Sequence, residues 1–268
     1  MRDMKQQVAL VTGSNRGIGF EIAKQLAMKK IKVILTSRDS ANGEAAVRKI
    51  ARDGVEKVVA MKLDVSNQVS VDNLLDKVEK TFGRLDILVN NAGQGQYGEF
   101  SETNIYRELS IIQLNISSLV VLTKLFLQDM IKKGKGRILN LSSVASKAPG
   151  PLNSVYHGTK AFVQSFTQAI ATEVKDQGIT ITALLPGATD TDFFNKADMQ
   201  QSKVVKDGKL EEAKTVAKEG YDALMRGDQM VVSGGLKNKM KIAMSNVLSD
   251  KAAAKKMHKE SAPAEEGE

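Results

Sequence analysis

Short apolar runs of strand length alternate with segments of helical pattern along most of the sequence. The runs are rich in Val, Ile and Leu, and they lack the strict apolar–polar alternation of a sheet with one solvated face. Between them, apolar residues recur at helical spacing, as at Ile18, Ile22 and Leu26. The expected strands cover residues 7–11, 32–37, 57–63, 85–90, 136–141, 180–185 and 229–232. This order predicts an α/β fold with a doubly wound parallel sheet of about seven strands and helices on both faces.

The length of the chain and a change of pattern near residue 235 predict the domain organisation. A chain of 268 residues is long enough for one α/β domain and short for two. We therefore expect a single domain over residues 1–235. Residues 188–228 interrupt the alternation with a long, polar, helical stretch, which is either a lid over a ligand crevice or a surface-packed insertion. Residues 236–268 are expected to form an amphipathic helix and an acidic tail that is disordered from Ser261 onward.

The expected C-terminal helix has an apolar face formed by Met240, Met244, Val247 and Leu248. A stripe of this kind packs on its own domain or on a second subunit more often than on lipid. Lysines flank the start of the helix, so contact with a membrane surface is the alternative. We expect no membrane partner.

The composition excludes several kinds of chemistry. The chain contains no Cys and only two His, so we expect neither disulfides nor a metal site. The net charge is +8, but aromatic residues make up only 4% of the chain, so nucleic acid is not an expected partner. We find no secretory signal and no stretch of the roughly 18 apolar residues that a membrane span needs. A cytoplasmic protein that acts on a small molecule is the expectation.

A glycine-rich turn lies where the first expected strand ends and the first expected helix begins. A Cβ atom at its glycines would prevent both the tight turn and the close approach of a ligand to the backbone. The free N–H groups and the positive dipole end of the helix attract phosphate. We therefore expect a dinucleotide pyrophosphate to bind Gly13, Ser14, Asn15, Arg16, Gly17, Ile18 and Gly19.

The end of the second expected strand indicates which dinucleotide binds. Ser37 is small and uncharged, and the guanidinium of Arg38 presents a fork that suits the extra phosphate of NADP. Arg16 is a second candidate for that phosphate. Asp39 lies about 20 residues beyond Gly19, in the range of an NAD ribose ligand, but past the strand end it is expected to cap the next helix. NADP(H) is therefore preferred, and NAD(H) is the alternative.

Tyr156 and Lys160 lie one helical turn apart on the same face of an expected helix. A free phenol has a pKa near ~10, and a nearby ammonium, helped by a nicotinamide ring, is expected to lower it, so that the pair acts as a general acid/base. Ser143, thirteen residues before Tyr156, ends an expected strand, where its hydroxyl can bond a substrate carbonyl. A surface pair is the alternative for the Tyr–Lys motif taken alone. His157 points about 100° away from Tyr156 and is expected to be a packing residue.

Taken together, these motifs resemble those of the short-chain dehydrogenase/reductase family. The shared features are the Thr-Gly-x-x-x-Gly-x-Gly loop, the Asn-Asn-Ala-Gly that closes the fourth strand, the Tyr-x-x-x-Lys pair and a later Pro-Gly, in order over residues 6–235. The resemblance implies a Rossmann-like fold and catalytic roles for Asn115, Ser143, Tyr156 and Lys160. It also implies further cofactor contacts from Asp64, Val65, Asn91, Ala92, Gly93, Tyr156, Lys160, Pro186, Gly187, Thr189 and Thr191. A strand-to-helix cap is the alternative for Asp64.

The reaction that the resemblance implies is an NADPH-dependent carbonyl reduction, or alcohol oxidation in reverse. A hydride moves between nicotinamide C4 and a carbonyl carbon, Ser143 orients the carbonyl and Tyr156 exchanges the proton. Lys160 holds the nicotinamide ribose, and Asn115 supports a proton relay. A non-catalytic NADP(H)-binding sensor or scaffold is the main alternative. A dehydratase or epimerase and a membrane-surface enzyme are two others.

The identity of the substrate is only coarsely indicated. Candidate pocket residues are 94–97, 147–152 and the pair Phe193-Phe194, which mix Gly, Pro and apolar side chains. We expect a medium-sized, partly apolar carbonyl compound or alcohol. A homo-oligomer, either a dimer or a tetramer, is also expected. In many members of the family a last strand and a short tail complete the tetramer interface. Residues after 235 do not resemble that ending, which puts a tetramer in doubt.

Overall fold

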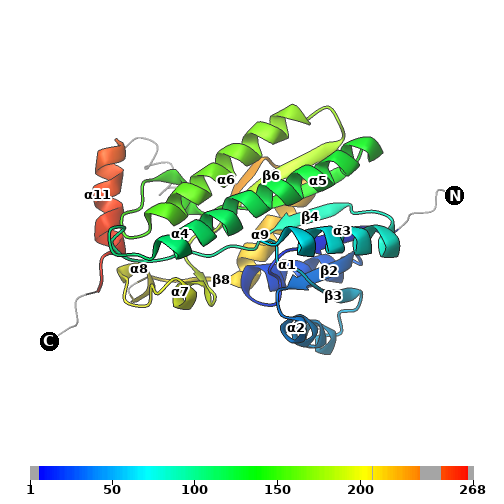
Figure 1. Ribbon diagram of the computed structural model, residues 1–268, viewed down its shortest axis with the longest axis horizontal. Coiled ribbons are helices and arrows are strands. Elements are labelled where there is room, and N and C mark those ends of the chain that lie inside the picture. The colour runs from blue at the N-terminus through cyan, green and yellow to red at the C-terminus, as the bar shows by residue number, and fades with distance from the viewer. Residues whose placement is uncertain (1–5, 207, 236–248, 265–268) are drawn as a thin grey trace.

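In a computed structural model, residues 6–206, 208–235 and 249–264 are described, and they are built around a parallel sheet (Figure 1). Its seven strands run in the order β3-β2-β1-β4-β5-β6-β9, and every neighbouring pair is parallel. The strands are β1 (Val8–Val11), β2 (Lys32–Ser37), β3 (Val58–Lys62), β4 (Ile87–Asn90), β5 (Gly136–Leu141), β6 (Ile179–Leu185) and β9 (Met230–Val232). Every predicted strand is present, and the predicted doubly wound α/β fold is confirmed.

Helices cover both faces of this sheet. One face carries α1 (Gly17–Met28), α2 (Ser40–Arg52) and α9 (Ala213–Arg226), and the other carries α3 (Gln68–Phe82), α5 (Ser118–Lys133) and α6 (Ser154–Glu173). Successive side chains of β1 enter opposite cores: Leu10 packs with α3 and α5, whereas Val11 packs with α1. Because both faces are buried, the strands are continuously apolar.

The helical run that leads into α5 contains a π-helical turn. α4 (Ile105–Ile112) continues through the π turn Gln113–Ser117 into α5 without a break. The run Ile105–Lys133 is long and apolar enough to cross a membrane, so the expectation that no such stretch exists was wrong. Its inward side carries Leu122, Phe126 and Met130, which are buried against the sheet as in the core helix of an α/β layer.

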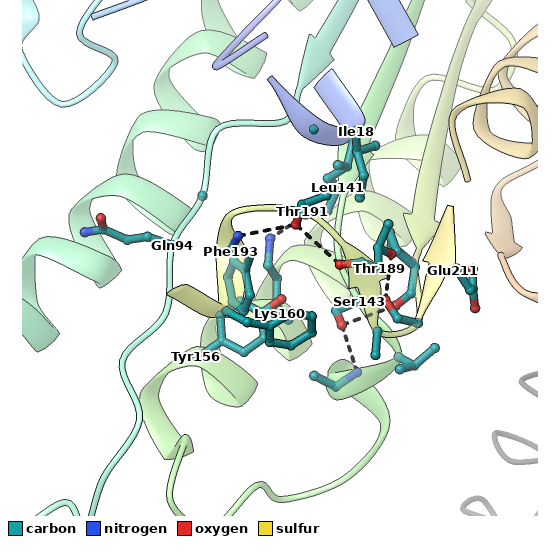
Figure 2. Close-up of a pocket in the computed structure, with 18 of the residues that line it drawn as sticks. Ile18, Gln94, Leu141, Ser143, Tyr156, Lys160, Thr189, Thr191, Phe193 and Glu211 are labelled. Atoms are coloured by element: carbon teal, nitrogen blue, oxygen red, sulfur yellow. Dashed lines mark hydrogen bonds between the residues drawn. The ribbon is translucent and has the colours of Figure 1, made fainter. Parts of the chain in front are cut away.

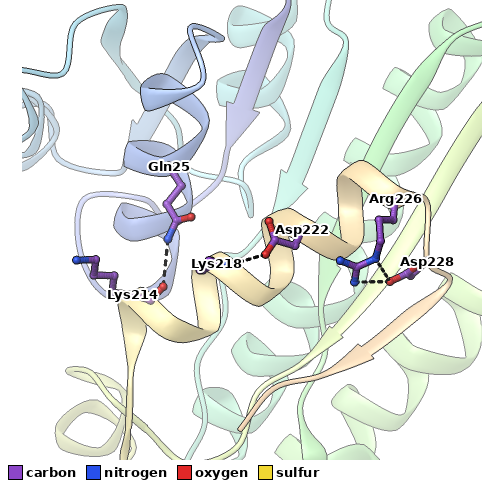
Figure 3. A network of polar contacts seen from close by, with 6 residues as sticks. All are labelled: Gln25, Lys214, Lys218, Asp222, Arg226 and Asp228. Atoms are coloured by element: carbon purple, nitrogen blue, oxygen red, sulfur yellow. Dashed lines mark hydrogen bonds and ion pairs between the residues drawn. The ribbon is translucent and has the colours of Figure 1, made fainter. Parts of the chain in front are cut away.

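The range 188–228 contains two kinds of structure. α9 buries Val216, Ala217 and Leu224 against the sheet, and ion pairs such as Lys218–Asp222 (2.6 Å) line its outer side (Figure 3). α9 is therefore a covering helix of the sheet and not part of a lid. The remainder lies beyond the strand ends as β7 (Thr189–Asp190), α7 (Phe193–Lys196), α8 (Lys203–Lys206) and β8 (Glu211–Glu212).

The described part of the C-terminal region is a helix followed by an extended segment. The expected stripe at residues 240–248 lies outside the described residues. Helix α11 (Asp250–Ser261) stands beside α8 at one end of the molecule (Figure 1). Pro263 then pairs with Ser202 in an antiparallel bridge, so the prediction of disorder is wrong for residues 261–264. The reason is that backbone hydrogen bonds to a distant segment order this small, polar stretch.

Candidate active site

A cavity of about 1390 Å³ opens at the carboxyl ends of the strands. In an open parallel sheet, this edge is where ligands bind, because the strand order reverses there. Most of the predicted site residues line the cavity: Gly13, Asn15, Arg16, Gly17, Ile18, Ser37, Arg38, Val65, Asn91, Ala92, Gly93, Ser143, Tyr156, Lys160, Pro186, Gly187, Thr189 and Thr191. Segments far apart in the sequence therefore meet at one site.

Four predicted residues lie behind the cavity wall. Ser14 is fully buried and ties two strands together, since its Oγ donates to Val11 O (2.7 Å) and its N–H donates to Thr36 O. Gly19 faces the strand layer, where a Cβ would collide with Asn91 Nδ2. Asp64 Oδ1 accepts from Ser66 N (3.0 Å) in a local turn, whereas Asn67 is the N-cap of α3, so the capping alternative expected for Asp64 is not what the structure has. Asn115, the fourth, supports the site from behind.

The glycine-rich turn has the geometry of a phosphate cradle. Gly13 and Gly17 adopt φ values of +58° and +60°, a left-handed conformation that favours glycine. α1 starts directly after Arg16, and within the described structure no side chain caps its first N–H groups. Asn91 Nδ2 donates to Thr12 O (2.8 Å) and Gly13 O (2.9 Å), which holds the turn in place. Unclaimed N–H groups at a helix start fit an anionic pyrophosphate.

The far end of the cavity is formed by the end of β2. Ser37 and Arg38 both line it, and Arg38 forms no ion pair with the described residues. Asp39 Oδ1 accepts from Asn42 N (2.8 Å) as the N-cap of α2, so the capping role expected from the sequence is present. Arg16 pairs with Asp192 (2.6 Å). Of the two candidate arginines, Arg38 is therefore the one left to meet an added anion.

Tyr156, Ser143 and Lys160 converge at the centre of the cavity (Figure 2). Tyr156 and Lys160 project from α6, and Ser143 follows β5 as the N-cap of a short 3₁₀ helix, η2 (Val144–Lys147). Ser143 lies close enough to Tyr156 to influence the pKa of its hydroxyl. Lys160 Nζ lies 5.7 Å from the Tyr156 ring centroid and donates to Leu141 O (2.8 Å). The hydroxyl groups of Ser143 and Tyr156 and the ammonium group of Lys160 therefore face the same part of the cavity.

Burial determines the protonation of this cluster. It raises the pKa of Tyr156 to about 12, and the nearby Ser143 lowers that pKa by a smaller amount. It also lowers the pKa of Lys160 to about 8. The sequence predicted a lowered Tyr156 pKa, and the direction is the opposite, because loss of phenolate hydration outweighs the effect of Ser143. At neutral pH the phenol is protonated, which suits a proton donor.

Asn115 sits inside the π turn and braces the cavity from behind. Its Oδ1 accepts from Gln94 N (3.0 Å), and its Nδ2 donates to Gln94 O (2.9 Å) and Thr159 Oγ1 (3.0 Å). A Cβ on Gly93 would lie 3.3 Å from Asn115 Oδ1 and 3.5 Å from Lys160 Nζ. The π turn therefore places an amide beside the loop that faces Lys160, which is a common use of such turns.

Two parts of the site were missed or only partly predicted from the sequence. The ring of Phe193 packs 5.1 Å from that of Tyr156, a contact between segments far apart in sequence. Met257, Lys259, Glu260 and Ser261 also line the cavity, although the sequence predicted no part of the site in the C-terminal region and predicted disorder from Ser261 onward. No local pattern predicts these contacts, which depend on tertiary packing. His157 is buried, its Nδ1 lies 2.9 Å from Ala148 O, and it packs as predicted.

Comparison with known proteins identifies the class. A family model for short chain dehydrogenases matches residues 7–202. The chain is 34% identical over 246 residues to a 3-oxoacyl-(acyl-carrier-protein) reductase from Haemophilus influenzae, covering 87% of this chain and 99% of the relative. It is 31% identical over 209 residues to glucose 1-dehydrogenase 2 from Bacillus subtilis, covering 76% of this chain and 81% of the relative.

Solved structures agree. A short-chain dehydrogenase from Sphingobium yanoikuyae in complex with NADPH has a TM-score of 0.78 at 26% identity, covering 91% of this chain and 96% of that one. A 3-ketoacyl-(acyl-carrier-protein) reductase from Brucella melitensis complexed with NADH has a TM-score of 0.77 at 26% identity, covering 88% and 100%. The chain belongs to the short-chain dehydrogenase family. It is an NAD(P)-dependent short-chain oxidoreductase that acts on a small-molecule substrate.

Proposed function

We propose that the protein is an NADPH-dependent carbonyl reductase, with alcohol oxidation as the reverse reaction. The observation that carries this proposal is the cluster of buried Ser143 and Lys160 with partly buried Tyr156, which faces the same cavity as the glycine-rich turn. A dinucleotide site and a proton donor in one cavity are what such a reduction requires. The ketoacyl reductases and glucose dehydrogenase among its relatives act on carbonyl or hydroxyl groups, which supports the same reaction class.

The cofactor would be held along the strand ends. The glycine-rich turn from Gly13 to Ile18 would bind the pyrophosphate, and residues 91–93 and 186–191 would contact the rest of the dinucleotide. When bound, the cofactor supplies the hydride. The NADPH preference rests on the uncharged Ser37 and on Arg38, which forms no ion pair with the described residues, since a guanidinium attracts a phosphate. The similar solved structures contain either NADPH or NADH. The proposed preference for NADPH therefore depends on the charges at the end of β2.

The residues of the chain would then direct the proton. Tyr156, protonated at neutral pH, donates its proton to the carbonyl oxygen, which Ser143 orients by a second hydrogen bond. Lys160 stabilises the phenolate that this donation leaves behind. Asn115 holds Gln94 and Thr159 in place and supports the path by which a proton returns to Tyr156.

We also propose that the segment 189–212 acts as a lid. It reaches the cavity wall through Phe193 and Phe194 and is held by two ion pairs, Arg16–Asp192 (2.6 Å) and Arg107–Asp198 (2.7 Å). Such pairs near the surface contribute little each, about 0–1 kcal/mol, so opening would depend mainly on the backbone hydrogen bonds of the segment, such as that from Tyr97 N to Ala197 O (2.8 Å). Closure of the segment would exclude water from Tyr156.

The decisive experiment is a panel of ketones, aldehydes and alcohols, followed by NADPH absorbance and repeated with NADH. Turnover of at least one carbonyl class with NADPH, faster than with NADH, is the expected result. Binding of NADPH without turnover of any compound would favour the sensor or scaffold alternative. Failure to bind either dinucleotide would reject the proposal.

A homo-oligomer is the second part of the proposal. α4 presents exposed Ile105, Tyr106 and Leu109, and Phe162 on α6 is also exposed. A contiguous apolar face of this kind is typical of a protein–protein contact. Sedimentation analysis of the wild type and of Leu109→Glu tests it: an oligomer that dissociates in the variant is expected, and a monomeric wild type would contradict it. The cytoplasmic location stays a prediction.

A further inference from the structure

The outer end of the cavity is closed by the end of the chain. We call residues 249–264 the C-terminal strap; they comprise the capping residue Ser249, helix α11 and the extended segment that follows. Met257, Lys259, Glu260 and Ser261 of the strap line the cavity that also contains Tyr156. The strap follows the last strand of the sheet in sequence, yet it lies over the site that the first strands build.

Several hydrogen bonds attach the strap to two other segments of the chain. Lys203 N donates to Ala262 O (3.0 Å), and Ala264 N donates to Gln201 O (2.8 Å), on either side of the Ser202–Pro263 bridge. Tyr97 Oη donates to Ser261 O (2.6 Å) from the loop after β4. The strap is therefore built into the site and does not merely rest on it.

The strap adds an apolar side chain to a cavity that the segment 189–212 lines with both apolar and charged side chains. Met257 is partly buried at the cavity, and Met199, Val204 and Leu210 line the same cavity from the segment 189–212. Phe193, which packs on the Tyr156 ring, connects these apolar side chains to the proton donor. An apolar surface that leads away from the reacting group favours a ligand with an apolar chain on that side.

We propose that Met257 of the C-terminal strap is a specificity-determining residue, and that the site takes carbonyl compounds whose apolar chain extends toward it. This inference rests on the proposed reductase function. Met257 contacts the chain of the substrate and has no part in proton transfer. Tyr97 is a positioning residue, because it acts by holding Ser261.

The test compares methyl ketones of increasing chain length with four variants. Met257→Ala removes the contact, and Met28→Ala on the exposed end of α1 is its control. Tyr97→Phe removes the hydrogen bond to the strap, and Tyr106→Phe, at a tyrosine with 79% exposure, is its control. The wild type should show kcat/KM rising with chain length. Met257→Ala should lose about tenfold for the longest ketones and little for the shortest, mainly through KM.

Tyr97→Phe should weaken the same preference, with a smaller loss of kcat/KM for the shortest ketone than for the longest. Equal chain-length dependence in the wild type and in Met257→Ala would overturn the proposal. Hydrogen exchange provides a readout without turnover: a long-chain ketone should protect the Ala262 and Ala264 amides in the NADPH complex. If NADPH binds but no ketone reacts, the reductase function fails; if ketones react and these amides gain no protection, only the strap proposal fails.

A different observation supports a second inference. Lys147 ends η2, between Ser143 and Tyr156 in sequence, and it lines the cavity. It is partly buried, and it has neither an ion pair nor a hydrogen bond to its side chain among the described residues. Burial lowers its pKa. A partly desolvated cation that forms no ion pair with the described residues would be stabilised by a ligand that supplies an anion.

We infer that the substrate carries an anionic group, which Lys147 binds. The test compares an oxo acid with its methyl ester in the wild type, in Lys147→Met and in Lys196→Met, an exposed lysine of the same cavity. The wild type and Lys196→Met should prefer the acid, and Lys147→Met should lose about tenfold of that preference. Equal kcat/KM for acid and ester in the wild type, or a preference that survives in Lys147→Met, would reject this inference.

Discussion

Replacing Tyr156 by Phe isolates the phenol hydroxyl from everything else that the side chain does. The ring would keep its contacts, since Phe193 lies 5.1 Å and His157 6.2 Å from its centroid. Only the hydroxyl and its interaction with Ser143 are removed. The change therefore separates proton donation from packing.

The structure sets the expected size of both effects. Loss of a positioned general acid lowers the rate by about 10²–10⁴-fold. Ser143 Oγ still accepts from Ala145 N (3.1 Å) and lies 3.4 Å from Pro186 O, so it is not left without partners. The free energy of unfolding should then change by no more than about 1 kcal/mol, the net contribution of one hydrogen bond. The hydroxyl does not contact the glycine-rich turn, so the affinity of Tyr156→Phe for NADPH should be close to that of the wild type.

The assay measures kcat/KM by NADPH absorbance, NADPH Kd by fluorescence titration and stability by thermal unfolding. Tyr106→Phe is the matched control, since that tyrosine is exposed on α4. Tyr156→Phe should lose turnover while its Kd and unfolding temperature stay close to those of the control. Retained turnover would refute the assigned role. Lost turnover together with lost NADPH binding or lost stability would show that the residue is structural.

Three further predictions concern the cofactor preference set by Arg38, the support that Asn115 gives to the cavity and the burial of Lys160. Arg38→Asp should shift the ratio of kcat/KM for NADPH and NADH toward NADH by about tenfold or more, because reversing the charge removes an attraction and adds a repulsion of about 1 kcal/mol each even in water; an unchanged ratio would place phosphate recognition elsewhere. Asn115→Ala leaves both backbone groups of Gln94 unpaired, so urea unfolding should show a loss of about 1–3 kcal/mol, and an unaltered stability would contradict the bracing role. Lys160 has a folded pKa of about 8 against a reference of 10.5, so the unfolded chain binds more protons between these values and the stability of the cofactor-free protein should rise with pH there. Lys160→Met should lack this rise in urea midpoint from about pH 8 to about pH 10, and parallel curves would show that the ammonium is not desolvated.

The strands and helices could be predicted from the sequence because each depends on the pattern of residues within its own short segment. A strand buried on both faces is a short apolar run, and the helices between the strands show their own spacing. Motifs at the strand ends, such as Ser37-Arg38 after β2 and Ser143 after β5, were therefore expected to meet at one edge, and they line one cavity. The strand order β3-β2-β1-β4-β5-β6-β9 was not predicted, because the same alternation fits more than one doubly wound order.

Other parts of the site depend on long-range packing and on solvent exclusion. The predicted lid contained α9, because the polar sequence of that helix does not reveal that Val216 and Leu224 face the core. The direction of the Tyr156 pKa was predicted from its neighbour Lys160, whereas burial by the surrounding segments raises it to about 12. The spacing of residues in the sequence does not show how far folding removes a side chain from water.

The amino-acid sequence by itself determined the fold class, the family and the set of groups available for chemistry, because these depend on periodicity and on residue types at short spacing. The tertiary structure decided where the remaining chain closes the cavity. Met257 and Ser261 reach the site through backbone pairing with residues 201–203, and Tyr97 holds them there. Backbone N–H and C=O groups are the same in every residue apart from proline, so their pairing across distant segments is settled only when the whole chain has folded.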